Sequence, residues 1–161
     1  MESKNPREYL QVTRQDSDRV TGVNISRQQS TEANLSFYEE FAIRGIQVDH
    51  FQPGSISCSF VVPPRLTDRN GYLAVGAIAN LVDKIGAMAF YEKETAMPLS
   101  VDMSISYLST AKLDDELEIN SNLLGRKGAY HGTHVVLKKK TTGEMIAEGR
   151  HSLFRKPKSK I

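Results

Sequence analysis

The chain has 161 residues, with 21 basic and 19 acidic side chains and a single cysteine. This length is typical of one domain whose core is stable without disulfides or metal ions. The mixed charges, which sum to +2, argue against a dedicated nucleic-acid surface, and no apolar stretch approaches the roughly 20 residues of a transmembrane helix. We therefore expect a protein that binds small molecules or copies of itself.

The first 33 residues are polar and contain too few apolar residues to define a buried face, so we predict a disordered or loosely docked arm over 1–33. Acidic residues at Glu2, Glu8 and Asp16 argue against a signal or transit peptide. A short helix is predicted next, over 37–43. Asn34 or Ser36 can cap its start, and Gly45 is well placed to end it.

Two strands, 46–51 and 55–62, are predicted on either side of a Pro-Gly turn at 52–55, which suits a tight hairpin. The second strand contains Cys58, whose neighbours alternate between serine and apolar residues. We interpret Cys58 as a small core residue in a reducing compartment. A role as a nucleophile is disfavoured, because the flanking sequence supplies no histidine or helix start to activate the thiol.

A long helix is predicted over 73–91, where the chain is apolar, rich in alanine and free of proline. Its apolar residues form a stripe at helical spacing, made of Val75, Ile78, Val82, Ile85 and Ala89 and widened by Leu81 and Met88. An apolar surface of this width predicts a helix that is surrounded by protein.

Four more strands are predicted at 99–107, 117–124, 130–138 and 145–154, with short turns at 126–128 and 141–144. In strand 99–107 apolar and polar residues alternate, which predicts one buried face. The order of elements predicts the α+β class: a curved antiparallel sheet of about six strands wrapped around one long central helix. This single domain would span 34–155, followed by a basic tail at 156–161.

Several segments resemble a known family. They are Leu81-Val82-Asp83 in the long helix, strand 99–107 with Ser109, Ala111 and Lys112 after it, and the closing run from Thr142 to His151. Together they resemble the hotdog-fold acyl-CoA thioesterases of the thioesterase-superfamily-member-2 and phenylacetyl-CoA thioesterase type, over about residues 45–154. The resemblance implies a homodimer joined edge to edge, pairing further into a homotetramer, with the active site between two subunits.

The family motif at the helix start is only partly present. In that family a loop Asn and a His-Gly-Gly precede the helical acid at fixed distances. Counting back from Asp83 places the His-Gly-Gly positions at Ala74, Val75 and Gly76, and the loop Asn position at Asp68. The histidine, the first glycine and the loop amide are therefore replaced, whereas the helical acid is kept.

The resemblance implies that Asp83 activates a water molecule as general base, and that the N–H groups of Val75 and Gly76 stabilise the oxyanion. Valine keeps a backbone N–H, but a β-branched residue resists the positive φ or close approach that glycine allows. Asp68 would bring a second negative charge toward the reaction centre. Ser100, which is kept at the strand position, can bind the base or the attacking water.

The nucleotide of coenzyme A needs a basic rim, and Arg126, Lys127 and Arg150 match the region where the family contacts it. The plainer interpretation is that these side chains are simply solvated. Neither a cofactor nor a metal site is predicted, because CoA belongs to the substrate and no paired His or Cys spacing is present. The C-terminal Ser159-Lys160-Ile161 resembles the peroxisomal Ser-Lys-Leu address, so we predict a cytoplasmic or peroxisomal location.

Three functions are open at this point. The first is an acyl-CoA thioesterase acting on fatty or aromatic acyl-CoA. The second is a hotdog acyl-CoA-binding protein that has lost turnover, suggested by Ala74, Val75 and Asp68. The third is a dehydratase or hydratase, which is disfavoured because no histidine lies near the helix start.

Two structural alternatives accompany these functions. Asp83 can be a surface residue beside Lys84, with no role in chemistry. The histidines of the C-terminal half, His131, His134 and His151, are not assigned with Ser100 to a Ser-His triad, because no Gly-x-Ser-x-Gly elbow is present.

Overall fold

The computed structural model describes residues 14–15, 37–91 and 97–155. Contacts divide the chain into two units, Met1–Tyr38 and Glu39–Ile161, and in the first unit residues 14–15 are helical. The rest of the predicted arm, the caps Asn34 and Ser36, and the tail 156–161 with its peroxisome-like end lie outside the described residues. These features stay predictions.

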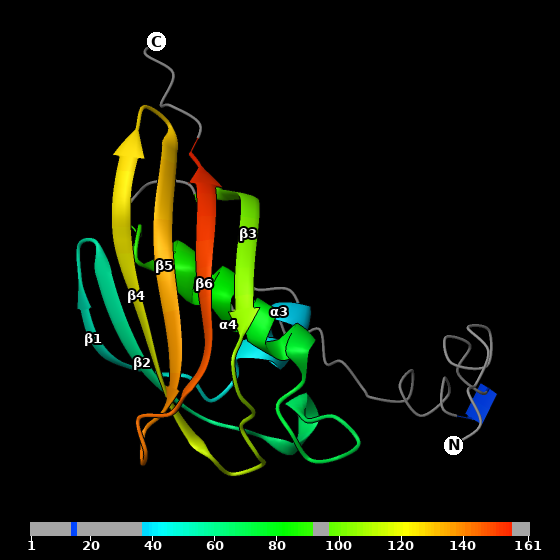
Figure 1. The fold of residues 1–161 in the computed structure, drawn as a ribbon. Helices are drawn as coiled ribbons and strands as arrows, with labels where there is room; N and C mark the ends of the chain where they lie inside the picture. The colour runs from blue at the N-terminus through cyan, green and yellow to red at the C-terminus, as the bar shows by residue number, and fades with distance from the viewer. Residues whose placement is uncertain (1–13, 16–36, 92–96, 156–161) are drawn as a thin grey trace. The chain divides into compact units, whose positions relative to one another are not determined.

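The second unit is an antiparallel sheet with one long helix on one face (Figure 1). In chain order the elements are α3 (Phe37–Ile43), β1 (Gln47–Gln52), β2 (Ser55–Val61), the 3-10 helix η1 (Pro64–Leu66), α4 (Val75–Met88), β3 (Leu99–Tyr107), β4 (Glu116–Lys127), β5 (Tyr130–Lys139) and β6 (Met145–Phe154). The sheet order is β1-β2-β4-β5-β6-β3. The predicted α+β class with one central helix is confirmed.

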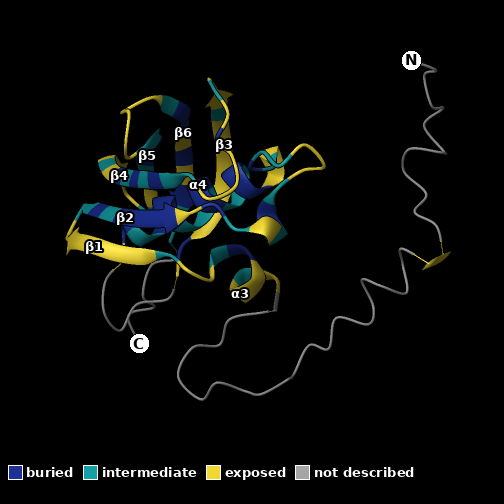
Figure 2. Cartoon of the chain, turned by 90° about the horizontal axis from the view of Figure 1, so that it is seen from below, coloured by how far each residue is buried: buried dark blue, intermediate teal, exposed yellow. Residues whose placement is uncertain are grey.

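Helix α4 provides the centre of the core, and it contacts β3, β4, β5 and β6 (Figures 1 and 2). Its apolar stripe packs on inward-facing side chains of the sheet, among them Phe60, Leu117, Ile119, Val135 and Leu137. Helix and sheet approach closely at Gly149 of β6, where a Cβ atom would lie 2.7 Å from Val82 Cγ1. A side chain at position 149 would therefore force Val82 or the strand to shift.

Helix α4 begins two residues later than predicted. The Leu73 N–H donates to the Ala111 carbonyl at 2.8 Å, and Ala74 is still extended, with φ −63° and ψ 141°. These backbone contacts keep the chain out of the helix until Val75. The side chain of Val75 was predicted to belong to the buried stripe, and this is wrong: it is 59% exposed at the open end of the helix.

Strand β4 is longer than predicted and continues to Lys127. Arg126 pairs with His131 and Lys127 pairs with Tyr130, and the chain reverses at Gly128, which has φ +61°. Glycine adopts this left-handed conformation without steric cost. Arg126 and Lys127 therefore lie in the end of a strand and not in a turn, as the sequence had suggested.

Strand β3 forms one edge of the sheet, and eight of its nine residues are exposed. The prediction of one buried face is wrong for the single chain, since Leu99, Val101 and Tyr107 are 68%, 55% and 45% exposed. Figure 2 shows β3 coloured largely as exposed. The apolar residues alternate as predicted, but nothing within the described residues covers them. An uncovered apolar edge strand of this kind is a site for pairing with another chain.

The single cysteine behaves as predicted. Cys58 lies in β2 with its side chain fully buried in the core. Burial, with a smaller contribution from the negative charge of Asp49, raises the pKa of the Cys58 thiol to about 11. The thiol is therefore protonated at neutral pH and is no nucleophile.

Candidate active site

The structure brings together the helical acid and the strand serine of the family pattern. Asp83 lies in the second half of α4, and Ser100 lies at the start of β3. The Ser100 hydroxyl donates a hydrogen bond of 2.6 Å to Asp83 Oδ1. The Asp83 side chain is 25% exposed, so solvent or a substrate can reach a carboxylate whose orientation is fixed by the protein.

The second oxygen of this carboxylate faces a positive charge. Lys84 Nζ lies 3.6 Å from Asp83 Oδ2 and 2.8 Å from Glu39 Oε1. The hydrogen bond to Glu39, followed by the charge of Asp83, raises the pKa of Lys84 above its ordinary value. Lys84 therefore stays charged. Its contact with Asp83 is also what the alternative of a surface residue beside Lys84 expects, so the hydrogen bond from Ser100 is the observation that favours a site.

Sequence reasoning missed a third member of this cluster. His151 Nε2 lies 3.6 Å from Asp83 Oδ1, and its side chain is fully buried. The available signal was its place in β6, where alternate residues face the core and a histidine occupies an inward position. The arrangement is not a Ser-His-Asp triad, because the carboxylate and not the imidazole lies between the other two groups.

Burial lowers the pKa of His151 from its usual 6.5, although the negative charges of Asp83 and Asp102 oppose this shift. Below pH 6.5 the unfolded chain gains a proton at this site before the folded protein does, so stability should fall as the pH falls through that range. We expect the melting temperature to drop more steeply from pH 7.5 to pH 5 in the wild type than in His151→Gln, measured by thermal denaturation. His50→Gln is the matched control, since His50 is exposed on β1, and it should keep the wild-type slope. Equal slopes in wild type and His151→Gln would contradict this assignment.

The predicted oxyanion donors lie at the start of α4. The N–H groups of Ala77 and Ile78 bond to the Ala74 carbonyl, so those of Val75 and Gly76 belong to the open end of the helix. Among the described residues other than glycine, Asp114 alone has a positive φ. Val75 therefore needs no glycine-like backbone, and its replacement of glycine leaves the N–H available.

One chain alone does not bring these donors to the base. At about 1.5 Å of rise per residue, the eight steps from Val75 to Asp83 cover about 12 Å along the helix axis. A reacting carbonyl must lie about 3 Å from both the nucleophile and the oxyanion donors. The base and the donors of the same helix are therefore too far apart to act on one thioester.

Asp68 has a structural role in the loop before α4. Its Oδ1 accepts hydrogen bonds from the backbone N–H groups of Asn70 (2.8 Å) and Tyr72 (3.0 Å). This is the pattern by which Asp commonly stabilises a turn. The carboxylate charge is therefore engaged by backbone donors of its own loop, and Asn70 lies in the turn itself.

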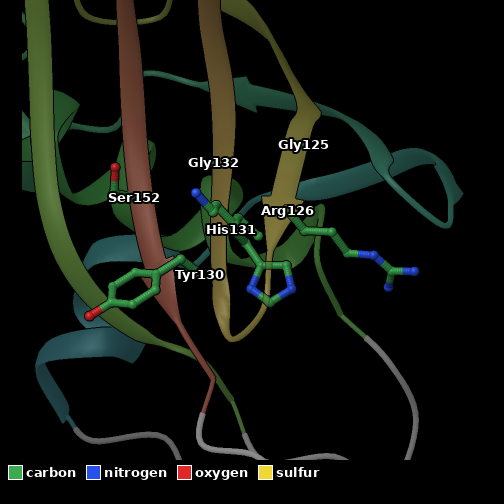
Figure 3. A pocket seen from close by; sticks show the side chains of 7 residues that line it. Gly125, Arg126, Tyr130, His131, Gly132 and Ser152 are labelled. Carbon is green, nitrogen blue, oxygen red and sulfur yellow. The ribbon is translucent and has the colours of Figure 1, made fainter.

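A pocket of about 390 Å³ opens beside the β4–β5 hairpin (Figure 3). Its lining is formed by Gly125, Arg126, Lys127, Tyr130, His131, Gly132 and Ser152. Arg126 reaches out on one side and Tyr130 lies on the other, with His131 between them (Figure 3). Two of the three predicted nucleotide contacts thus line one pocket, whereas the third, Arg150, is exposed on β6 and is not part of the lining.

The described residues contain no group of three or more His, Cys, Asp or Glu side chains placed to hold a metal ion. Within the same residues, no helix is long and apolar enough to span a bilayer.

Comparisons with known proteins agree with this fold. The thioesterase superfamily model matches residues 70–146. Human acyl-coenzyme A thioesterase 13 is 40% identical over 101 residues, which are 62% of this chain and 72% of that protein, and the mouse protein of the same name is 39% identical over the same shares. The crystal structure of zebrafish thioesterase superfamily member 2 has a TM-score of 0.70 and 31% identity, covering 78% of this chain and 90% of its own. The chain therefore belongs to the thioesterase superfamily and has the hotdog fold.

Proposed function

We propose that this protein hydrolyses the thioester of a fatty or aromatic acyl-CoA to the free acid and CoA. The observation that carries the proposal is the Asp83 carboxylate, which is partly exposed and is oriented by the 2.6 Å hydrogen bond from Ser100. Asp83 takes a proton from a water molecule, whose oxygen bonds to the thioester carbon. The carbon–sulfur bond then breaks, and the proton passes from Asp83 to the leaving sulfur, which releases CoA as the thiol and restores the carboxylate. Water is the only co-reactant, so no cofactor is required.

The oxyanion donors come from a second copy of the chain in this proposal. The N–H groups of Val75 and Gly76 are too far along the helix from Asp83 of the same subunit, whereas the exposed apolar edge of β3 can pair with its counterpart. A homodimer joined at β3 would bring two α4 helices together and build two sites from both subunits. Assembly of two such dimers into a tetramer is the further expectation from the family.

The pocket beside the β4–β5 hairpin is the proposed site for the CoA nucleotide. Arg126 and Lys127 carry positive charge suited to phosphates, and the Tyr130 ring offers a face on which an adenine can stack. The pocket is open to solvent, so CoA can leave it after each turnover. The substrate is compatible with either predicted compartment, cytoplasm or peroxisome.

The binding-only alternative rests on Ala74, Val75 and Asp68. Its premises are weakened by two observations: Val75 keeps its backbone N–H in an ordinary helical conformation, and the Asp68 carboxylate is held by its own loop. Hydrolysis is therefore the function we favour.

Thiol release from a panel of aliphatic and aromatic acyl-CoAs tests the proposal, with the matching acyl-pantetheine thioesters as substrates that lack the nucleotide. The wild type should turn over at least one class. In the double variant Arg126→Glu and Lys127→Glu, KM for acyl-CoA should rise about tenfold, the equivalent of about 1.4 kcal/mol of lost phosphate contacts, with acyl-pantetheine unaffected. Absence of thiol release across the panel would contradict hydrolysis, and an equal effect on both substrate types would contradict the nucleotide site.

A further inference from the structure

The cluster around Asp83 extends inward through two buried polar side chains on neighbouring strands. His151 of β6 and Thr133 of β5 lie directly opposite each other in the sheet register, and both side chains are buried. They meet α4 at Gly86, where a Cβ atom would lie 2.8 Å from His151 Nδ1 and 3.2 Å from Thr133 Oγ1. Both atoms thus lie beneath the same point of the helix, and only glycine leaves room for them.

These buried groups are unusually poor in hydrogen bonds. Among the described residues, neither ring nitrogen of His151 has a hydrogen-bond partner, and Thr133 Oγ1 has none either. Burying polar groups in this way is unfavourable, and most proteins avoid it unless the groups have a role. The nearest charged group is Asp83, whose Oδ1 lies 3.6 Å from Nε2, and contacts of this length commonly shorten when substrate binds.

The neutral His151 ring can donate to Asp83 in only one of its two tautomers. Burial favours the neutral imidazole, which carries a single N–H. If that proton is on Nε2, the ring donates to the Asp83 carboxylate; if it is on Nδ1, two unprotonated acceptors face each other. A hydroxyl near Nδ1 can decide between the two tautomers: by donating a hydrogen bond to unprotonated Nδ1, it favours the tautomer with the proton on Nε2.

We propose that His151 is a positioning residue that holds the catalytic carboxylate of Asp83, and that Thr133 selects the tautomer in which it can do so. This inference rests on the proposed hydrolysis. In the structure Oδ1 accepts from the Ser100 hydroxyl and lies 3.6 Å from His151 Nε2. In the proposed arrangement this second contact shortens to a hydrogen bond from the Nε2–H, and the anchored carboxylate presents Oδ2 to the water. Neither His151 nor Thr133 touches the substrate.

The decisive variants are Thr133→Val, which removes the hydroxyl at almost constant volume, and Thr133→Ser, which keeps it. We expect kcat to fall about tenfold in Thr133→Val with KM unchanged, and to stay near the wild-type value in Thr133→Ser. His151→Leu should lower kcat by about a hundredfold, and His151→Gln, whose amide can donate near the Nε2 position, should recover part of that loss.

Ser121→Ala provides the matched control. Ser121 on β4 is also a fully buried hydroxyl without a hydrogen-bond partner in the described structure, but it faces Val135 and not His151 across the strands. Its removal should leave kcat unchanged. Melting temperatures of all variants separate loss of folding from loss of rate.

Nitrogen-15 NMR of the histidine rings supplies a readout that does not depend on turnover. We expect the Nε2–H tautomer for His151 in the wild type and in Thr133→Ser, and its loss in Thr133→Val. An Nδ1–H tautomer in the wild type, or Thr133→Val with wild-type kcat, would overturn the proposal. A wild-type protein that hydrolyses no thioester would instead refute the proposed function, and the tautomer measurement would still decide the role of Thr133.

Discussion

Asp83→Asn should lower kcat for acyl-CoA hydrolysis by about 10²- to 10⁴-fold, the usual contribution of a general base. An amide has almost the same shape as the carboxylate and can still accept the hydrogen bond from Ser100. It cannot take a proton from water, so the loss should appear in kcat and leave KM little changed. Steady-state kinetics with the best substrate of the panel measure this effect.

The fold should tolerate this change. Lys84 keeps its 2.8 Å contact with Glu39 when the Asp83 charge is removed. Asp83 itself is partly exposed and does not belong to the buried hydrophobic core. Asp115→Asn is the matched control, because Asp115 is a comparably exposed carboxylate that accepts a backbone hydrogen bond from Lys112 outside the site. If Asp83→Asn retained a tenth or more of the wild-type kcat, Asp83 would not be the base.

Charge at the β3 edge should abolish both dimer formation and activity. In the double variant Leu99→Lys and Val101→Lys, two residues that are 68% and 55% exposed in the single chain become charged. The isolated subunit should fold, since these side chains are already in solvent. The lysines on two facing β3 edges should repel each other where apolar side chains would otherwise be buried together. The protein should then sediment as a monomer in analytical ultracentrifugation.

The loss of activity follows from the length of α4. A monomer keeps Asp83 but has no oxyanion donors within reach of it, and removal of such donors lowers rates by about 10²- to 10³-fold. The matched control carries the same charges on the far side of the sheet from β3, as Val48→Lys in the edge strand β1 and Val61→Lys at the end of the neighbouring β2, where the side chains are 59% and 52% exposed. This control should stay at least dimeric and active. A monomeric double variant with wild-type turnover would show that one subunit is sufficient.

Local patterns in the sequence predicted most of the fold. The alternation around Cys58 in β2 and the alanine-rich apolar run of α4 each indicate the buried face directly, and the Gly-containing turns separate the strands of the C-terminal half. The Pro-Gly and Gly128 turns are likewise encoded by residues whose backbone preferences are local. Turns and periodicity depend on residues that are close in sequence, so both can be predicted from the sequence.

The ends of helices and strands were less well predicted where hydrogen bonds to residues far along the chain determine them. The start of α4 is delayed by the hydrogen bond from Leu73 to Ala111, a residue far along the chain. The length of β4 depends on pairing with β5, which placed Arg126 and Lys127 in a strand. The exposure of β3 could not be read from its alternation, because alternation predicts that a face is apolar and does not say whether it is covered by the same chain.

The sequence by itself determined the hotdog order of elements and the family, and it singled out a helical acid, Asp83, and a strand serine, Ser100, as candidate site residues. The structure showed that the serine binds the acid. Only the tertiary structure placed His151 and Thr133 beneath Gly86, and His151 beside that acid, since these residues come from β6, β5 and α4. The physical reason is that a hydrogen-bonding cluster depends on the distances between strands and helix. Sequence periodicity predicts which face a side chain lies on, but it does not predict which residues that side chain meets across the core.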